Sequence, residues 1–139
     1  MRPNEIFLSH ADKDRSFVKR LAGMLAGHGL KVWYSRRHLK GADQWHDEIG
    51  DALRRCNWFV IVLSPNSIRS EWVRRELIYA LRKRRYRRRI VPILYKECDF
   101  ERFSWTLVST QRVDFTKGYR WVVWSYCVSG KWIIRGGLF

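Results

Sequence analysis

The chain is poor in acidic residues, in cysteine and in proline, and these shortages narrow its class. Its 139 residues hold 13 Asp and Glu against 28 Lys and Arg, a formal charge of +15, with three Cys and three Pro. Three widely spaced Cys favour reduced thiols in the cytoplasm over a disulfide framework or a zinc site. No apolar run approaches the roughly 18–20 residues of a membrane span. The first residues lack the apolar stretch of a secretory signal, so we expect none.

Apolar and aromatic residues are plentiful by contrast. They make up 46% and 15% of the chain, which suits one domain with a core of its own and excludes intrinsic disorder. The positive charge is compatible with nucleic-acid binding, since phosphate contacts are mainly electrostatic. It is dense only once, however, in the run Arg82–Arg89. We therefore favour a solvated face, or a docking patch for an acidic protein partner, at this run over nucleic acid, and we expect no contact with a membrane.

Strand-like and helix-like segments alternate over the first hundred residues. Apolar runs predict strands at Glu5–Ser9, Leu30–Tyr34, Trp58–Leu63 and Ile90–Tyr95, and a short fifth strand within Val108–Asp114. The uninterrupted run Trp58–Leu63 indicates burial on both faces, as in a parallel sheet. We predict an α/β domain with a mostly parallel, flavodoxin-like sheet of order 2-1-3-4-5, flanked by helices.

The helices between these strands have recognisable ends. Asp12, Asp43 and Ser70 are suitable N-caps for the first, second and third helix. The first helix is expected to end near Gly27 or Gly29. Pro92 argues against a fully hydrogen-bonded fourth strand, because proline has no N–H to donate.

The amino-acid composition of the chain changes after residue 116. Residues 119–139 include three Trp and no acidic residue. Their pattern fits a helix or a hairpin turning at Ser129-Gly130, and neither is preferred. We therefore divide the chain into a domain of residues 1–116 and an element of residues 117–139. This element either completes the domain or forms a contact surface.

Ligands of open α/β sheets bind at the carboxyl ends of the strands, where the strand order reverses. For the order 2-1-3-4-5, this point lies beside the loops Ser9–Asp14 and Ser64–Ser70. Glu76, on the third helix, lies about 85° from the centre of that helix's apolar stripe, which predicts a boundary carboxylate that is only partly desolvated. The spacing alone favours an ordinary ion pair with Arg69 or Lys83. The chain carries no glycine-rich phosphate loop and no zinc-protease motif.

Four motifs in sequence order resemble those of the Toll/interleukin receptor (TIR) domain, over about residues 4–115. They are Ile6–His10 with Asp12 and Asp14; Val32–Tyr34 with Leu39–Trp45 and Glu48-Ile49; Phe59–Asn66 with Ser70–Trp72 and Arg75–Leu77; and Ile90–Ile93. The resemblance implies the flavodoxin-like TIR fold.

TIR domains include enzymes that cleave the nicotinamide–ribose bond of NAD⁺ and adaptors that recruit other TIR domains. The enzymes carry a glutamate in a Trp-x-x-x-Glu context after the third strand. Trp72–Glu76 matches this context, so the resemblance implies that Glu76 is catalytic. It implies an NAD⁺ glycohydrolase of immune or anti-phage defence that releases nicotinamide and ADP-ribose or a cyclic variant. NAD⁺ is then a substrate, and neither cofactor nor metal is expected. The alternative is a non-catalytic adaptor or scaffold that acts through TIR–TIR contacts.

The resemblance also implies a set of substrate-binding residues: Phe7, Ser9, His10, Ala11, Leu39, Lys40, Gly41, Asp43 and Trp72. The first four are expected to line the nicotinamide side, and the next four belong to the BB loop, which covers it. Trp72 either stacks on a ring of the substrate or packs at the start of its helix. Trp33 and Trp45 are expected in the core. Because related enzymes are active when domains stack through the BB loop, the resemblance implies a homo-oligomer.

Overall fold

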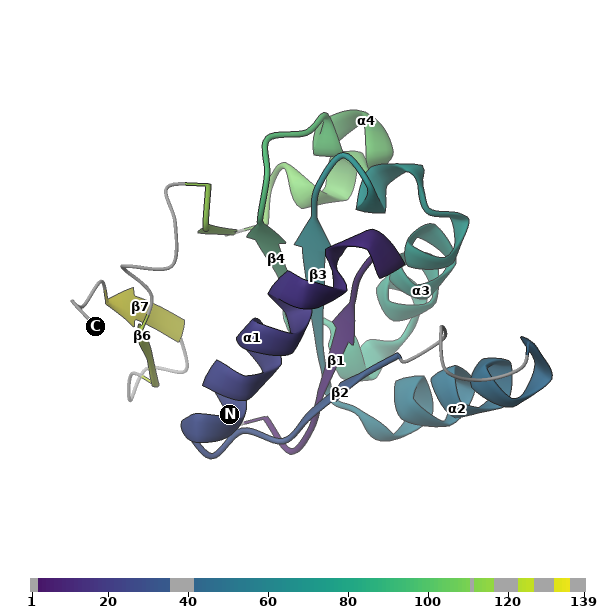
Figure 1. Ribbon diagram of the computed structural model, residues 1–139, viewed down its shortest axis with the longest axis horizontal. Helices are drawn as coiled ribbons and strands as arrows, with labels where there is room; N and C mark the ends of the chain where they lie inside the picture. Colours follow the sequence, from purple (N-terminus) through teal and green to yellow (C-terminus); the bar gives the residue numbers. More distant parts are fainter. Residues whose placement is uncertain (1–2, 36–41, 111, 117–122, 127–131, 136–139) are drawn as a thin grey trace.

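A five-stranded parallel sheet forms the centre of the protein (Figure 1). The computed structural model describes residues 3–35, 42–110, 112–116, 123–126 and 132–135. The strands of the sheet are β1 (Ile6–Ser9), β2 (Val32–Tyr34), β3 (Trp58–Leu63), β4 (Ile90–Leu94) and β5 (Val113–Asp114). Their order is β2-β1-β3-β4-β5, and each neighbouring pair is parallel. The predicted order 2-1-3-4-5 is confirmed.

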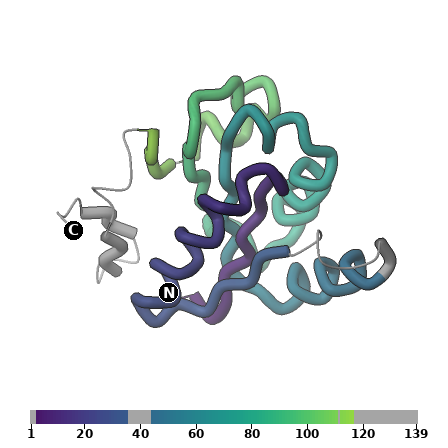
Figure 2. The backbone as a smooth tube through the Cα atoms, in the orientation of Figure 1, coloured from purple at the N-terminus to yellow at the C-terminus, as the bar shows by residue number. Residues whose placement is uncertain are grey.

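Helices cover both faces of the sheet, with α1 on one face and α2 and α3 on the other (Figures 1 and 2). The α-helices are α1 (Arg15–Gly27), α2 (Ala42–Arg55), α3 (Glu71–Arg82) and α4 (Phe100–Phe103). Short 3-10 turns are η1 (Asp12–Asp14), η3 (Ser67–Arg69), η4 (Arg84–Tyr86) and η5 (Trp105–Leu107). Within the described ranges, no helix combines the length and the apolar character needed to cross a membrane.

Side chains alternate across the sheet and so build one core on each face. Ile6 and Leu8 of β1 point toward α1, where they join Phe17. Phe7 points the other way and joins Phe59 in the core under α2 and α3. All residues of β3 are buried, as its uninterrupted apolar run predicts for a central parallel strand.

Two predicted helix ends are confirmed. Ser70 caps α3, and its Oγ accepts a hydrogen bond from the Val73 N–H at 3.4 Å. The helix α1 ends at Gly27, and Gly29 follows with a φ of 77°. Glycine adopts this left-handed conformation readily because it has no Cβ to clash with the backbone.

Two predicted N-caps are wrong. Asp12 begins the turn η1, so α1 starts only at Arg15, with Asp14 at its N-cap position and no side-chain cap bond. A helix-capping pattern does not reveal such an intervening turn. The helix α2 begins at Ala42, so Asp43 lies in its first turn instead of preceding it.

An ion pair joins the start of β1 to the end of α2. The Arg55 Nε donates to Glu5 Oε2 at 2.7 Å and the Arg55 Nη2 donates to Oε1 at 3.0 Å. Lys31 Nζ lies 3.8 Å from the same carboxylate. The hydrogen bonds from Arg55 lower the pKa of Glu5, although burial opposes them. Burial raises the pKa of the neighbouring Cys56 thiol to about 12.

Pro92 fits its strand because its nitrogen faces away from β3. The Tyr95 N–H donates to the Leu63 carbonyl of β3 at 2.9 Å, and alternate residues of a parallel strand bond to opposite neighbours. Pro92 therefore faces the β5 side, where β5 pairs only with Ile93 and Leu94. Within the described residues, the missing N–H therefore costs no hydrogen bond of the sheet.

The C-terminal segment contains a second sheet. β6 (Val123–Tyr126) and β7 (Trp132–Arg135) pair in antiparallel register, from Val123 with Arg135 to Tyr126 with Trp132. This agrees with the hairpin interpretation and not with the helix. Ser129-Gly130 lies outside the described residues, and the division of the chain at residue 116 stays a prediction.

Candidate active site

β1 and β3 bring together the two loops that the sequence singles out. The strands pair in parallel, with Ser9 opposite Ile61, so their carboxyl ends lie side by side. The chain leaves β1 into η1 and leaves β3 into η3 and then α3. The strand order reverses here, because β2 flanks β1 and β4 flanks β3. This is the edge at which open parallel sheets bind their ligands.

Ser9 and Glu76 meet at this edge. Ser9 ends β1 and lies on the same face of the sheet as Phe7, toward α3. Its hydroxyl donates to Glu76 Oε2 at 2.5 Å. The side chains are buried, since Ser9 is 1% and Glu76 4% exposed. A carboxylate of α3 is therefore held against the last residue of β1.

The expectation that Glu76 would lie at the boundary, only partly desolvated, is wrong. The helical periodicity considers α3 by itself, whereas the burial of Glu76 comes from β1, 67 residues away in the chain. Lys83 Nζ lies 5.0 Å from the centre of the Tyr79 ring. The ion pair of Glu76 with Arg69 or Lys83 stays a prediction.

A second buried carboxylate, Asp14, ties the two loops together. It is 4% exposed and accepts hydrogen bonds from the Ser64 hydroxyl and from Asn66 Nδ2, the latter at 2.9 Å. Ser64 is fixed in turn: its N–H donates to Ser67 Oγ at 2.8 Å, and the Ser67 N–H donates to Ser64 Oγ at 3.1 Å. Asp14 is absent from the predicted site residues. In the sequence, the only indications of this contact are an aspartate that follows the first strand and a polar segment that follows the third strand.

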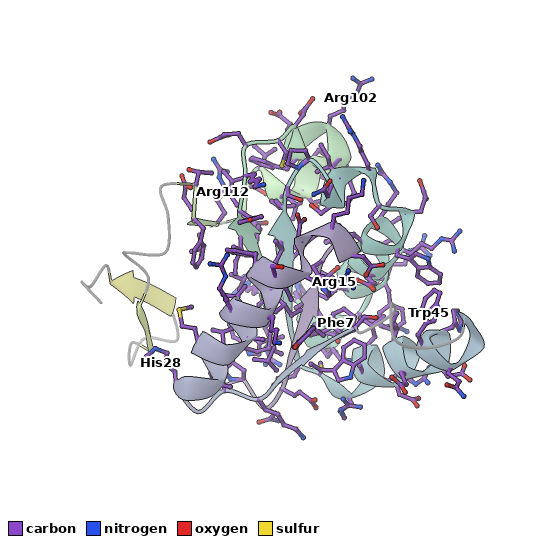
Figure 3. The ribbon with its side chains drawn as sticks, viewed as in Figure 1. Phe7, Arg15, His28, Trp45, Arg102 and Arg112 are labelled. Carbon is purple, nitrogen blue, oxygen red and sulfur yellow. The ribbon has the colours of Figure 1, made fainter. Side chains whose placement is uncertain are left out.

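Phe7 lies inside the fold (Figure 3). Its ring stacks on those of Trp33 and Phe59, with centroids 5.1 and 5.5 Å apart. Phe7 is thus a core residue beneath Ser9. Trp33 and Trp45 are partly buried against the same core, as expected.

His10 and Ala11 continue the chain from Ser9, and both are buried. His10 Nδ1 lies 3.4 Å from the Leu8 carbonyl oxygen, and its ring meets that of Tyr34 edge-on at 6.1 Å. These two residues therefore form the start of the loop between β1 and η1, and His10 contacts β2 through Tyr34.

Trp72 packs at the start of its helix. Its ring meets Trp45 edge-on, with centroids 4.3 Å apart, and His46 at 5.9 Å. Arg75 Cζ lies 5.3 Å from its centroid. Of the two roles left open for Trp72, the structure shows the packing one. It joins α3 to α2, the helix that follows the predicted BB loop.

The predicted BB-loop residues Leu39, Lys40 and Gly41 lie outside the described residues. Asp43 belongs to the first turn of α2. In the part of the chain that the structure describes, no three His, Cys, Asp or Glu residues are grouped as metal ligands. Burial raises the pKa of the Cys98 thiol to about 11, so this thiol is neutral and weakly nucleophilic at pH 7. Among the described residues, Glu76 and Asp14 are buried carboxylates at this edge.

Comparisons with known proteins agree with this fold. A family model described as TIR domain matches residues 6–122. The chain is 32% identical over 116 residues to the NAD(+) hydrolase PdTIR of Paracoccus denitrificans, covering 81% of the chain and 38% of that protein. It is 34% identical over 94 residues to the 2' cyclic ADP-D-ribose synthase AbTIR of Acinetobacter baumannii, covering 66% of the chain and 35% of that protein. The chain thus spans little more than a third of these relatives.

A solved structure has the same fold. The TIR domain of the Toll-related receptor TRR-2 from Hydra magnipapillata superposes with a TM-score of 0.66 at 23% identity. The match covers 79% of this chain and 82% of that one.

Proposed function

We propose that this chain, which belongs to the TIR domain family, cleaves the nicotinamide–ribose bond of NAD⁺. Glu76 is the catalytic carboxylate in this proposal. The observation that carries the proposal is the buried contact of Glu76 with Ser9 at the ligand-binding edge of the sheet. The reaction class is supported by relatives named NAD(+) hydrolase and 2' cyclic ADP-D-ribose synthase.

One carboxylate suffices for this reaction. Glycosidases ordinarily use one carboxyl group to protonate the leaving group and a second on the other face of the sugar. Nicotinamide is already a pyridinium cation in NAD⁺, so it takes the bonding electron pair and departs neutral without a proton. The positive charge that remains develops on the ribose, and a single anion placed beside it stabilises the transition state.

The burial of Glu76 strengthens this effect. Two unit charges about 4 Å apart interact by about 1 kcal/mol in water but by about 4 kcal/mol at the effective dielectric constant of a protein site. The Ser9 hydroxyl fixes the orientation of the carboxylate before the substrate arrives. Capture of the ribose by water gives ADP-ribose, and capture by the adenine base or by another nucleophile gives a cyclic or base-exchanged product.

The proposal includes the setting of the activity. The chain acts in the cytoplasm, in immune or anti-phage signalling, and self-association through the BB loop activates it. Family resemblance supports this part, and a rise in specific activity with protein concentration tests it. The alternative, a TIR adaptor without turnover, predicts association that depends on Leu39–Gly41 and no loss of NAD⁺ at any concentration.

The decisive experiment incubates concentrated protein with NAD⁺ and identifies the products by mass. Glu76→Gln keeps the size of the side chain and should lower turnover about 10²–10⁴-fold. Glu71→Gln, at an exposed glutamate of the same helix, is the matched control and should leave turnover unchanged. Wild-type turnover in a folded Glu76→Gln protein would remove Glu76 from the reaction.

A further inference from the structure

A basic cavity lies at the carboxyl end of α3, whereas Glu76 lies in the middle of this helix. Its volume is about 450 Å³, and its walls come from the last turn of α3, from η4, from the start of β4 and from Thr110. The start of β4 is the amino end of a strand, whereas Glu76 lies near the carboxyl ends of β1 and β3. Arg82 follows Glu76 by six positions, which is about 9 Å along the helix axis. The cavity and the candidate active site are therefore distinct.

Five cationic side chains line this cavity, and no carboxylate does: Arg82, Lys83, Arg84, Arg87 and Arg88. All five are exposed, and none forms an ion pair with a carboxylate among the residues that the structure describes. The carboxyl end of α3 contributes only about −0.5 of an elementary charge. The field in the cavity is therefore strongly positive, and an anion relieves the repulsion between its walls.

The floor of the cavity is apolar. Its accessible apolar side chains are Leu81, which is exposed, and Ile90, which is half-buried, whereas Ala80 and Tyr86 are buried. The Tyr86 hydroxyl donates to the Leu53 carbonyl at 2.6 Å, which fixes its ring in place. The Thr110 hydroxyl already donates to the Thr106 carbonyl at 3.0 Å, so charge recognition falls to the arginines and the lysine.

The volume of the cavity narrows the class of ligand. A cavity of this volume lies within the range of sites for small organic ligands, about 300–1,000 Å³. A nucleic acid or an acidic protein surface lies across such an opening without filling it. The combination of several cations with an apolar floor suits a compact molecule that has several negative charges and a planar apolar part.

We propose that this cavity binds a nucleoside di- or triphosphate, with its phosphates among the arginines that line the cavity and its base on the apolar floor. The sequence alone favours a solvated face or an acidic protein partner at Arg82–Arg89, and the cavity shifts this preference to a small polyanion. The proposal does not depend on NAD⁺ cleavage.

A matched pair of double variants tests it. Arg84→Gln with Arg87→Gln removes two charges from the cavity wall. Lys19→Gln with Arg85→Gln removes two charges elsewhere on the surface, one of them from the same basic run. All four side chains are exposed, so both proteins are expected to fold, which circular dichroism and thermal unfolding check.

Calorimetric titration with ATP, ADP, adenosine and tripolyphosphate measures binding to the wild-type chain and both variants. We expect ATP affinity to fall about tenfold or more in the cavity variant and to stay within about twofold in the control. Adenosine should bind far more weakly than ATP. Equal losses in both variants, or no loss in either, would overturn the proposal. So would tripolyphosphate binding as tightly as ATP, or a single-stranded oligonucleotide or acidic peptide binding more tightly at the same residues.

Discussion

Asp14 is expected to stabilise the fold by joining the loop after β1 to the loop after β3. Its carboxylate accepts one bond from Ser64, which is fully buried, and one from the half-buried Asn66. A hydrogen bond to a charged group contributes about 1.5–3 kcal/mol when buried, and the more exposed bond to Asn66 about 0.5–1 kcal/mol. Removing the carboxylate also removes its desolvation cost, which offsets part of the loss. We therefore expect Asp14→Ala to lower the free energy of unfolding by about 2 kcal/mol.

Urea unfolding followed by tryptophan fluorescence and circular dichroism measures this loss. Domains of this class have about 5–15 kcal/mol of stability in total, so the variant should still fold. A double-mutant cycle with Ser64→Ala isolates the shared bond, and a coupling of about 1 kcal/mol or more is expected because the two side chains are in contact. The reasoning is refuted if Asp14→Ala unfolds within about 0.5 kcal/mol of the wild type, or if the two substitutions are additive within that margin.

Three further predictions concern Ser9, Glu5 and Cys56. Ser9→Ala removes the hydroxyl that orients Glu76, so kcat for NAD⁺ should fall more than tenfold with little change in KM. Steady-state kinetics measure both constants, and an unchanged kcat would contradict this prediction. The pKa of Glu5 is lowered in the folded state from its ordinary value of 4.5 by the bonds from Arg55. The stability that Glu5 adds is therefore fully present above about pH 5 and is lost as the pH falls through the folded-state pKa. The difference in unfolding free energy between wild type and Glu5→Gln should shrink below pH 5, and a constant difference from pH 7 to pH 3 would refute it. Burial raises the pKa of Cys56 to about 12, so iodoacetamide at pH 8 should modify it in urea but not in the native protein, as peptide mass spectrometry can show.

Short-range patterns predicted the architecture correctly. The apolar run of β3, the cap at Ser70 and the glycines after α1 each depend on neighbours within a few residues, so the sequence displays them directly. The strand order followed from the alternation of strands with helices, supported by the resemblance to TIR domains. These features placed Glu76 on the correct helix near the correct edge of the sheet.

The details of the site could not be predicted in the same way. The Ser9–Glu76 contact spans 67 residues and the Ser64–Asp14 contact spans 50, and no local spacing encodes such pairs. The burial of Glu76 depends on which face of β1 carries Ser9, and this is settled only when the sheet packs on α3. Phe7 shows a different limit: its ring stacks on Trp33 and Phe59 in the core, and the substrate contact that the family resemblance implies stays a prediction.

Pro92 has a consequence for how this chain behaves when it is concentrated. Within the described residues, β5 pairs with Ile93 and Leu94 only, so the outer edge of β4 from Ile90 to Pro92 has no strand partner among them. Such edges invite a strand from another molecule to add itself, which starts aggregation. On this edge the alternation leaves Ile90 with an N–H facing outward, and Pro92 has none to offer. An incoming strand therefore cannot extend a continuous ladder along this stretch of β4, which resists edge-to-edge stacking even though the central strands of the sheet are almost entirely apolar.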